Sequence, residues 1–225
     1  MRRRAILIAP TEDPIYLADV AALCFALQAH RGYQRRDIAV LVGADDQVRD
    51  PGDGRPRMCR DARMRGLRSA LREAADLGAD DLLFVAVAGH GDGPPDGPPE
   101  DLIEMAAGRR LTSSELAVEL RPLPCRKLLL LGTCYGGSFP GAPFPRTTIV
   151  SACSAGEVSW STPNRTRTEF LMHFTNALAD PTATVAACFE HARNHDRWAQ
   201  PGAVAPRRET PLLWDPDGVA GTLRV

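Results

Sequence analysis

The sequence predicts an α/β fold, in which a mostly parallel sheet of six strands is covered by helices on both faces to give a three-layer α/β/α sandwich. Short apolar runs alternate along the chain with longer stretches whose apolar residues recur at helical spacing, as in parallel strands joined by helical crossovers. The runs are apolar throughout, which is typical of strands buried on both faces. We expect one domain over residues 1–225, because this length suits a single α/β domain and 44% of the residues are hydrophobic.

The predicted elements follow one another in alternating order. The strands are residues 4–10, 38–42, 82–88, 127–132, 148–152 and 211–214, and the helices are residues 15–30, 61–76, about 112–120, 169–178 and 183–198. In the first helix Leu17, Val20 and Leu23 share one face. Thr112 is followed three residues later by Glu115, which predicts a capping box at the start of the third helix.

Composition and charge argue against several classes of partner. The formal net charge is −1, so the chain has no overall attraction to nucleic acid or to an anionic membrane. No apolar run approaches the roughly 20 residues of a membrane helix. The apolar stretch after the basic start Met1-Arg2-Arg3-Arg4 is too short for a signal peptide. We therefore expect a cytoplasmic protein without nucleic-acid or membrane partners.

The six cysteines contain no CxxC pair, so a zinc-ribbon or zinc-finger site is not expected. Disulfides are not needed in a chain of this size and expected location. We expect most of these cysteines to serve as small core residues. No metal-binding residue and no resident cofactor are predicted.

Reactive side chains follow two of the predicted strands. Strand 82–88 ends at Gly89-His90-Gly91, and strand 127–132 leads into Cys134 and a glycine pair. Ligands bind at the carboxyl ends of strands in open α/β sheets, so neighbouring strands would bring the thiol and the imidazole to one crevice. There the thiolate would attack a carbonyl while the imidazole transfers protons. The N–H groups of Gly91 and Cys134 could bind the developing oxyanion.

Each of these residues also has a simpler explanation when it is taken alone. Free cysteine is among the most buried residue types, and a histidine beside glycine is commonly a turn residue. The two motifs together, each at a strand end, are a stronger signal than either one. A phosphate-binding loop is not favoured, because neither GxxxxGK[ST] nor GxGxxG is present.

Residues 83–91 (LFVAVAGHG) and 127–138 (KLLLLGTCYGGS) resemble the two catalytic motifs of the caspase-like cysteine peptidases, which include metacaspases, caspases and legumain-type enzymes. The histidine precedes the cysteine by a spacing close to the roughly 50 residues typical of caspases. The likeness continues in family order through residues 101–105, 149–159, 169–178 and 210–214. It implies a caspase-like fold and a cysteine endopeptidase acting on proteins or peptides through a thioester acyl-enzyme. It also implies that His90 is the general acid/base and Cys134 the nucleophile.

The resemblance also points to the S1 pocket, which holds P1, the substrate residue before the cleaved bond. Relatives carry Asp, Glu or Gln two residues before the nucleophile, where this chain has Gly132. The next strand lines S1 in the family, which implies Ser151 and Cys153 as pocket residues. The loop after the first strand borders S1 in relatives and here contains Glu12 and Asp13. We hypothesise that one of these carboxylates anchors a basic P1 residue; the alternative is that both are solvated loop or cap residues.

A basic P1 preference would make Arg165 and Arg167 candidate self-cleavage sites, because caspase-like enzymes are often cut after the nucleophile strand. The alternative is an ordinary exposed loop. Some metacaspases need calcium, and the Asp-rich loop at residues 45–53 leaves calcium activation open, although it lacks EF-hand spacing.

Two other functions stay open at this point. One is a catalytically silent caspase-like module that binds protein partners. The other is a thiol transpeptidase on the same fold, since hydrolysis and transfer begin with the same acyl-enzyme. The sequence predicts no oligomeric state.

Overall fold

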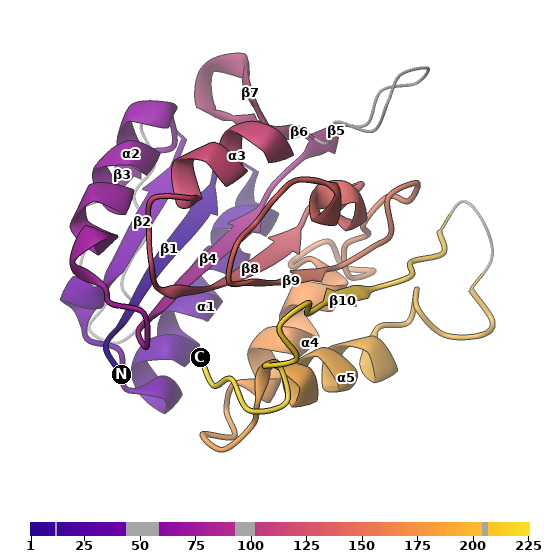
Figure 1. Cartoon of the computed structure of the whole chain (residues 1–225). Helices are drawn as coiled ribbons and strands as arrows, with labels where there is room; N and C mark the ends of the chain where they lie inside the picture. The colour runs from indigo at the N-terminus through magenta and orange to yellow at the C-terminus, as the bar shows by residue number, and fades with distance from the viewer. Residues whose placement is uncertain (12, 44–58, 93–101, 204–206) are drawn as a thin grey trace.

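The computed structural model describes residues 1–11, 13–43, 59–92, 102–203 and 207–225. Its main sheet contains β1 (Arg3–Ala9), β2 (Ile38–Val42), β3 (Arg60–Asp61), β4 (Leu82–Ala88), β8 (Arg126–Gly132), β9 (Thr147–Ser151) and β10 (Leu212–Trp214). The strands lie in the order β10-β9-β8-β4-β1-β2-β3 (Figure 1). Every pair is parallel except β10 with β9. The predicted mostly parallel sheet is confirmed.

The sheet has seven strands, whereas six were predicted; the strand that was missed is the edge strand β3. This strand is only two residues long and pairs in parallel with β2, Leu41 lying opposite Arg60. Its residues, Arg60 and Asp61, have neither the apolar character nor the length by which a strand is recognised in a sequence. Backbone pairing alone makes this segment a strand.

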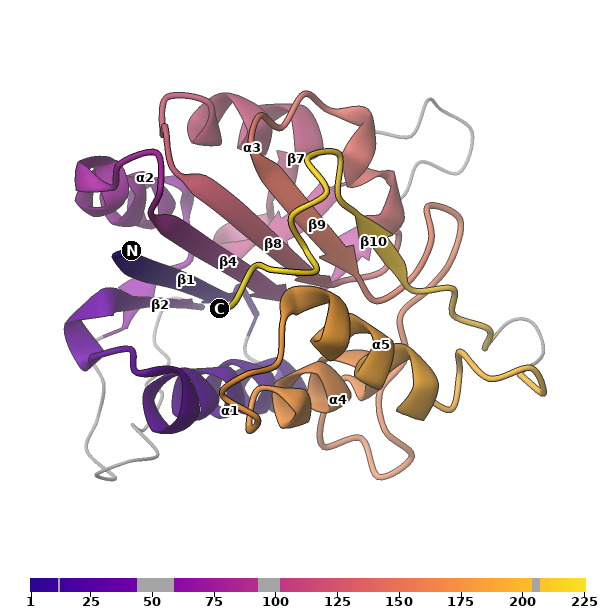
Figure 2. The ribbon, with the colours of Figure 1, turned by 60° about the horizontal axis from the view of Figure 1, so that its bottom comes forward.

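Helices cover both faces of the sheet, as the turned view in Figure 2 shows. One face carries α1 (Pro14–Arg31), α4 (Glu169–Ala177) and α5 (Val185–His195), and the other carries α2 (Met64–Glu73) and α3 (Ser113–Leu120). Because successive side chains of a strand point to opposite faces, Leu7 of β1 belongs to the first core and Ile8 to the second. The predicted three-layer arrangement is confirmed.

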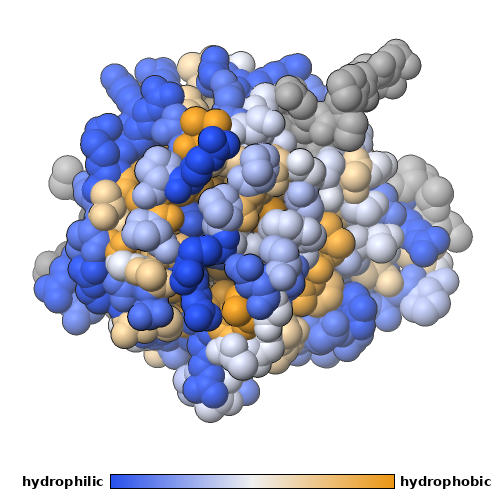
Figure 3. All heavy atoms as spheres, viewed as in Figure 1, coloured by the Kyte–Doolittle hydropathy of each residue, from blue (hydrophilic) through white to orange (hydrophobic). Residues whose placement is uncertain are grey.

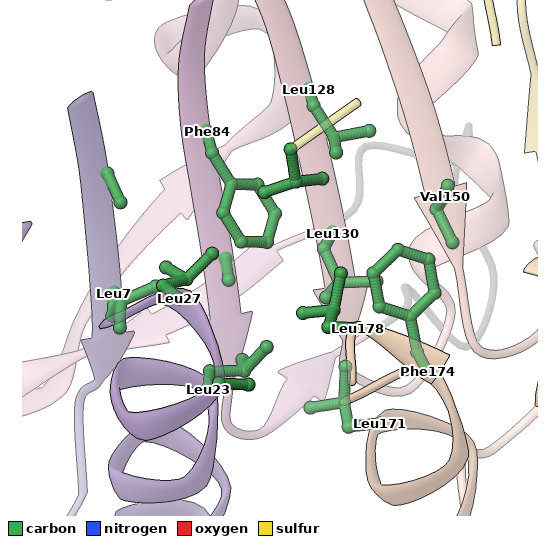
Figure 4. Packing of buried hydrophobic residues seen from close by; sticks show 14 of the residues in the cluster. Leu7, Leu23, Leu27, Phe84, Leu128, Leu130, Val150, Leu171, Phe174 and Leu178 are labelled. Carbon is green, nitrogen blue, oxygen red and sulfur yellow. The ribbon is translucent and has the colours of Figure 1, made fainter. Parts of the chain in front are cut away.

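The core on the α1, α4 and α5 face is the larger of the two. Figure 4 shows Leu27 of α1 and Phe174 of α4 turned toward the strands that carry Leu7 and Leu130. These side chains are fully buried, and each stabilises the fold by about 1.5–3 kcal/mol relative to an exposed position. This packing fixes the helix that follows β1 against the strand ends where the reactive residues lie.

Local signals set the helix ends. The side chain of Asp13 accepts a hydrogen bond from the Ile15 N–H, and Pro14 occupies the first turn, so α1 begins there. It ends at Gly32, which has the left-handed conformation (φ 70°) that favours glycine. The predicted capping box of Thr112 and Glu115 is present at the start of α3.

A small antiparallel sheet lies beside the end of β4 and consists of β5 (Gly91–Asp92), β6 (Leu102–Met105) and β7 (Arg109–Thr112). It begins directly after His90, whose carbonyl accepts a hydrogen bond from the Glu104 N–H at 3.1 Å. The backbone of the histidine is therefore held by two sheets.

Lys127, the only lysine of the chain, is buried near the start of β8. Its ammonium group donates hydrogen bonds to the carbonyl oxygens of Cys125 and Pro145, both at 3.0 Å. Burial lowers the pKa of this amine. Hydrogen bonds to the backbone thus replace the water that a lysine usually keeps.

Hydrophilic residues dominate the face drawn in Figure 3, where apolar residues form small separate patches. In the described part of the chain, no helix combines the length and the apolar character needed to cross a bilayer.

Candidate active site

The two predicted reactive residues leave neighbouring strands at the same level. Strands β4 and β8 are hydrogen-bonded in parallel with Ala88 opposite Gly132, and His90 and Cys134 each follow two residues later. Both side chains line one cleft of about 460 Å³. The thiol is half-buried and the imidazole is exposed. The sulfur is therefore open to the cleft and is not sealed in the core.

The surroundings of the sulfur keep the free thiol protonated. Burial raises the pKa of Cys134, and interactions with the backbone of Ser159, Gly91 and Cys134 itself oppose this rise. The thiol donates to the Ser159 carbonyl at 3.9 Å. No cation contributes to the shift, so the thiol does not ionise unaided near neutral pH. A base must remove its proton before it can attack, and the imidazole of His90 lines the same cleft.

Gly91 lies directly against the backbone of Cys134. A Cβ atom at Gly91 would stand 2.1 Å from the Cys134 carbonyl oxygen, so only glycine fits. The same tightness continues after the nucleophile, where a Cβ atom at Gly137 would stand 2.6 Å from Cα of Ser154. The Gly91 backbone is thus packed against that of Cys134, and these are the two residues whose amides are predicted to form the oxyanion hole.

Tyr16, in the first turn of α1, contacts the histidine. Its hydroxyl lies 3.2 Å from Nδ1 of His90, and the two rings meet edge to face with centroids 5.1 Å apart. Burial, with a contribution from Cys134, raises the pKa of this phenol far above its ordinary value. Sequence analysis missed Tyr16, because a tyrosine one turn into an amphipathic helix is no motif.

The opposite wall of the cleft contains two tryptophans, Trp160 and Trp198, with ring centroids 6.3 Å apart. The guanidinium of Arg207 lies over both rings, 5.3 Å and 5.7 Å from their centroids. Arg165 also lines the cleft, and neither arginine has a carboxylate partner among the residues that the structure describes. Trp198 and Arg207 come from the segment between α5 and β10, and no sequence signal linked them to the nucleophile.

A pair of buried carboxyl groups, Asp196 and Glu209, holds this aromatic wall from behind. Glu209 accepts a hydrogen bond from the Trp160 N–H, and its own N–H donates to the Trp198 carbonyl at 2.9 Å. Asp196 accepts from the Trp198 N–H at 2.8 Å. Burial raises the pKa of Asp196 to about 6 and that of Glu209 to about 11, and the two side chains are hydrogen-bonded to each other. At neutral pH the pair therefore shares one proton.

The predicted S1 residues are divided between the cleft and the core. Asp13 lines the cleft, but its Oδ1 accepts a hydrogen bond from the Ile15 N–H at 2.9 Å, which is the cap role proposed as its alternative. Gly132 also lines the cleft. A Cβ atom there would stand 2.1 Å from Cδ1 of Leu171, so the larger residue that relatives carry at this position has no room. Glu12 lies outside the described residues.

Ser151 and Cys153, the other predicted S1 residues, are not among the residues that line the cleft. Both are fully buried. The Ser151 hydroxyl donates to the Cys153 carbonyl at 2.8 Å, and the Cys153 thiol donates to the Thr133 carbonyl at 3.4 Å. They brace the turn that carries the nucleophile.

The two candidate self-cleavage residues differ in their surroundings. Arg165 is exposed in a turn, where its φ is 53°. Arg167 is ion-paired with the buried carboxylate of Asp19, which also accepts the Thr168 N–H at 3.0 Å. The side chain of Arg167 is thus held in place, whereas that of Arg165 is available.

Within the described ranges, no three His, Cys, Asp or Glu side chains are grouped so that they could hold a metal ion. The loop at residues 45–53, for which calcium was considered, lies outside those ranges.

No family model matches the sequence, and no curated protein matches it. Among solved structures, the chain is similar to the crystal structure of caspase-1 from Spodoptera frugiperda, with a TM-score of 0.63 and 13% sequence identity. The similarity covers 95% of this chain and 85% of that chain. At this identity the likeness shows the fold, which is caspase-like.

Proposed function

We propose that this caspase-like chain is a cysteine peptidase that cleaves proteins or peptides with Cys134 as nucleophile and His90 as general acid/base. The observation that carries the proposal is the shared cleft: a half-buried thiol and an imidazole on neighbouring strand ends line one opening. The amides of Gly91 and Cys134 at the sulfur supply the donors that acyl transfer requires.

The raised pKa of the thiol sets the order of proton transfers. His90 takes the Cys134 proton as the sulfur attacks the peptide carbonyl carbon, and the carbonyl oxygen becomes an oxyanion held by the two amides. The imidazolium then gives its proton to the leaving amine as the C–N bond breaks, which leaves a thioester. Water attacks the thioester with His90 as base, and the thiol is regenerated with a carboxylic acid product.

An electrophilic peptide probe tests the proposal directly. We expect the probe to form an adduct on Cys134, located by mass spectrometry, and to lose it in Cys134→Ala and His90→Ala. The control variant His30→Ala changes a histidine at the end of α1, away from the cleft, and should label like the wild type. Cys59, which is half-buried and does not line the cleft, reports nonspecific alkylation in the same sample. A folded wild type that the probe never labels would refute the proposal and favour a silent interaction module.

The P1 preference depends on the charges of the cleft. A preference for a basic P1 residue would depend on Asp13, which is the sole carboxylate among the described lining residues. Arg165 and Arg207 line the same cleft and favour an acidic side chain instead. Peptides with Arg, Asp, Asn or an apolar residue at P1 separate the two preferences, and cleavage after Asp alone would end the basic one.

Self-processing follows from a basic P1, and the free side chain of Arg165 makes this residue the better candidate than the ion-paired Arg167. Intact-mass measurement of purified wild type beside Cys134→Ala tests it, since equal masses after incubation would count against self-cleavage. Product analysis with an added amine separates hydrolysis from transpeptidation, because only a transferase forms the new amide in preference to the acid.

A further inference from the structure

Among the described residues, Tyr16 provides the one side-chain hydrogen bond to the imidazole of His90. Nδ1 lies 3.2 Å from the hydroxyl of Tyr16, and this contact leaves the other ring nitrogen, Nε2, without a protein partner among the described residues. A histidine that acts as a base needs an unprotonated nitrogen toward the nucleophile, and its second nitrogen usually binds a group that fixes the tautomer.

We propose that Tyr16 is a positioning residue for catalysis, whose hydroxyl oxygen accepts the Nδ1–H of His90 and so keeps Nε2 free to take the Cys134 proton. This inference rests on the proposed function and deepens it. It adds a third member to the Cys-His pair, with a neutral phenol in the place where other enzymes use a carboxylate.

The environment of the phenol suits this role. Burial and the neighbouring thiol keep Tyr16 protonated over the whole working range, since its pKa is raised from an already high value. A neutral acceptor orients the ring without binding the imidazolium as tightly as a carboxylate would, so the proton on Nε2 is still released to the leaving amine. When the ring is charged, Nδ1–H remains donated to the same oxygen, and no atom of Tyr16 changes its bonding during the reaction.

The fold holds the two rings together from both sides. Tyr16 stands in the first turn of α1, whose start is fixed by the Asp13 cap and by Pro14. The strand end that carries the histidine is pressed against the loop before α1, because a Cβ atom at Gly89 would stand only 2.9 Å from Cδ of Pro10. The tyrosine ring packs against the larger core. Hydroxyl and imidazole are thus placed by rigid elements.

Tyr16→Phe removes the hydroxyl and keeps the ring. We expect kcat for peptide cleavage to fall by about tenfold with KM little changed, as for the loss of one hydrogen bond to a group that becomes charged in the reaction. Tyr33→Phe is the matched control, because the Tyr33 hydroxyl is buried at the far end of α1 with no partner in the described structure. It should keep full activity. Circular dichroism and thermal melting establish that both variants fold.

Two readouts separate positioning from mere packing. The pH dependence of Cys134 alkylation by a small electrophile should shift in Tyr16→Phe and stay unchanged in Tyr33→Phe. In addition, ¹⁵N NMR of the imidazole should show the Nδ1–H tautomer of His90 in the wild type and a lower share of it in Tyr16→Phe. This second measurement does not depend on peptidase activity.

The outcomes distinguish the two proposals. Labelling of the wild type at Cys134 together with an unchanged rate, pH profile and tautomer in Tyr16→Phe would overturn the role of Tyr16 alone. A wild type that is not labelled would overturn the peptidase function, whatever the tautomer. An Nε2–H tautomer in the active wild type would also refute the inference, because the phenol would then be donating to Nδ1.

Discussion

Replacing Glu209 with alanine should loosen the aromatic wall of the cleft. The Glu209 carboxyl group accepts the Trp160 N–H and is hydrogen-bonded to Asp196, and both acidic residues are almost completely buried, at 2% and 0% exposure. The alanine variant leaves a buried N–H without an acceptor, which costs about 1–3 kcal/mol, and removes a hydrogen bond to a charged carboxylate, which costs a similar amount. We expect the free energy of unfolding of Glu209→Ala to lie about 3 kcal/mol below that of Glu209→Gln, which can keep both hydrogen bonds.

Glu209→Gln is the informative partner of this variant. Its amide oxygen can still accept the Trp160 N–H, and its amide N–H can donate to Asp196 as the protonated carboxyl does. Because the pKa of Glu209 is raised in the folded protein, the wild type takes up a proton when it folds at neutral pH, whereas glutamine needs none. Glu209→Gln should therefore be at least as stable as the wild type.

The pH dependence gives the sharper test. The pKa of Glu209 is raised from 4.5 to about 11, so the folded protein keeps a proton that the unfolded chain releases. The stability from this group is complete below the ordinary pKa and is lost as the pH rises toward the folded one. Glutamine has no such proton. As the pH rises, the free energy of unfolding of Glu209→Gln should therefore increase relative to that of the wild type by up to about 1.4 kcal/mol for each pH unit.

Urea unfolding followed by tryptophan fluorescence, between about pH 7 and pH 9, measures the difference where Asp196 is ionised in both proteins. Parallel pH dependences of the wild type and Glu209→Gln would refute the protonated pair. A Glu209→Ala variant as stable as the glutamine one would refute the hydrogen-bonding role.

Three further substitutions follow from the geometry of the cleft. Gly91→Ala should reduce probe labelling of Cys134 at least tenfold, since its Cβ atom meets a backbone carbonyl, whereas Gly141→Ala, with open space, should label normally. Gly132→Ala should lower the free energy of unfolding by about 1–3 kcal/mol, measured with heat or urea, because its Cβ atom meets Leu171. Adding Leu171→Ala should relieve this clash, so a double variant whose loss equals the sum of the two single losses would contradict the prediction. Arg207→Gln should raise the ratio of cleavage after Arg to cleavage after Asp about threefold, because it removes a positive charge from the cleft. The change should be smaller at high salt, and an unchanged ratio at low salt would show that Arg207 does not select the P1 residue.

The sheet and the two central residues of the site were predictable because their signals are local. Continuous apolar runs give buried strands, and a parallel sheet exposes their carboxyl ends at one edge, so His90 and Cys134 could both be assigned to that edge. That their strands are neighbours is shown by the pairing of β4 with β8. The capping box of Thr112 and Glu115 could also be predicted, because it depends on two residues three positions apart.

The rest of the cleft could not be predicted, because it joins segments that no local pattern connects. Trp198 and Arg207 line the cleft, and Glu209 supports them from behind, because of the path that the chain takes between α5 and β10. Ser151 and Cys153 lie at the strand end that the family likeness indicates, but their side chains are fully buried. This burial depends on the turn after Cys134, where a Cβ atom at Gly136 would stand 2.7 Å from the Ser151 hydroxyl oxygen.

The buried ammonium group of Lys127 has a practical consequence. It is the only ε-amine of the chain, and in the folded state its hydrogen bonds to two carbonyls keep it from reagents in solution. Among its amines, the native protein should therefore be acylated at the amino terminus alone, and a reagent should reach Lys127 only when β8 separates from its surroundings. The rate of that second modification then reports how often the strand leading to the nucleophile opens, at one identifiable peptide in a mass spectrum.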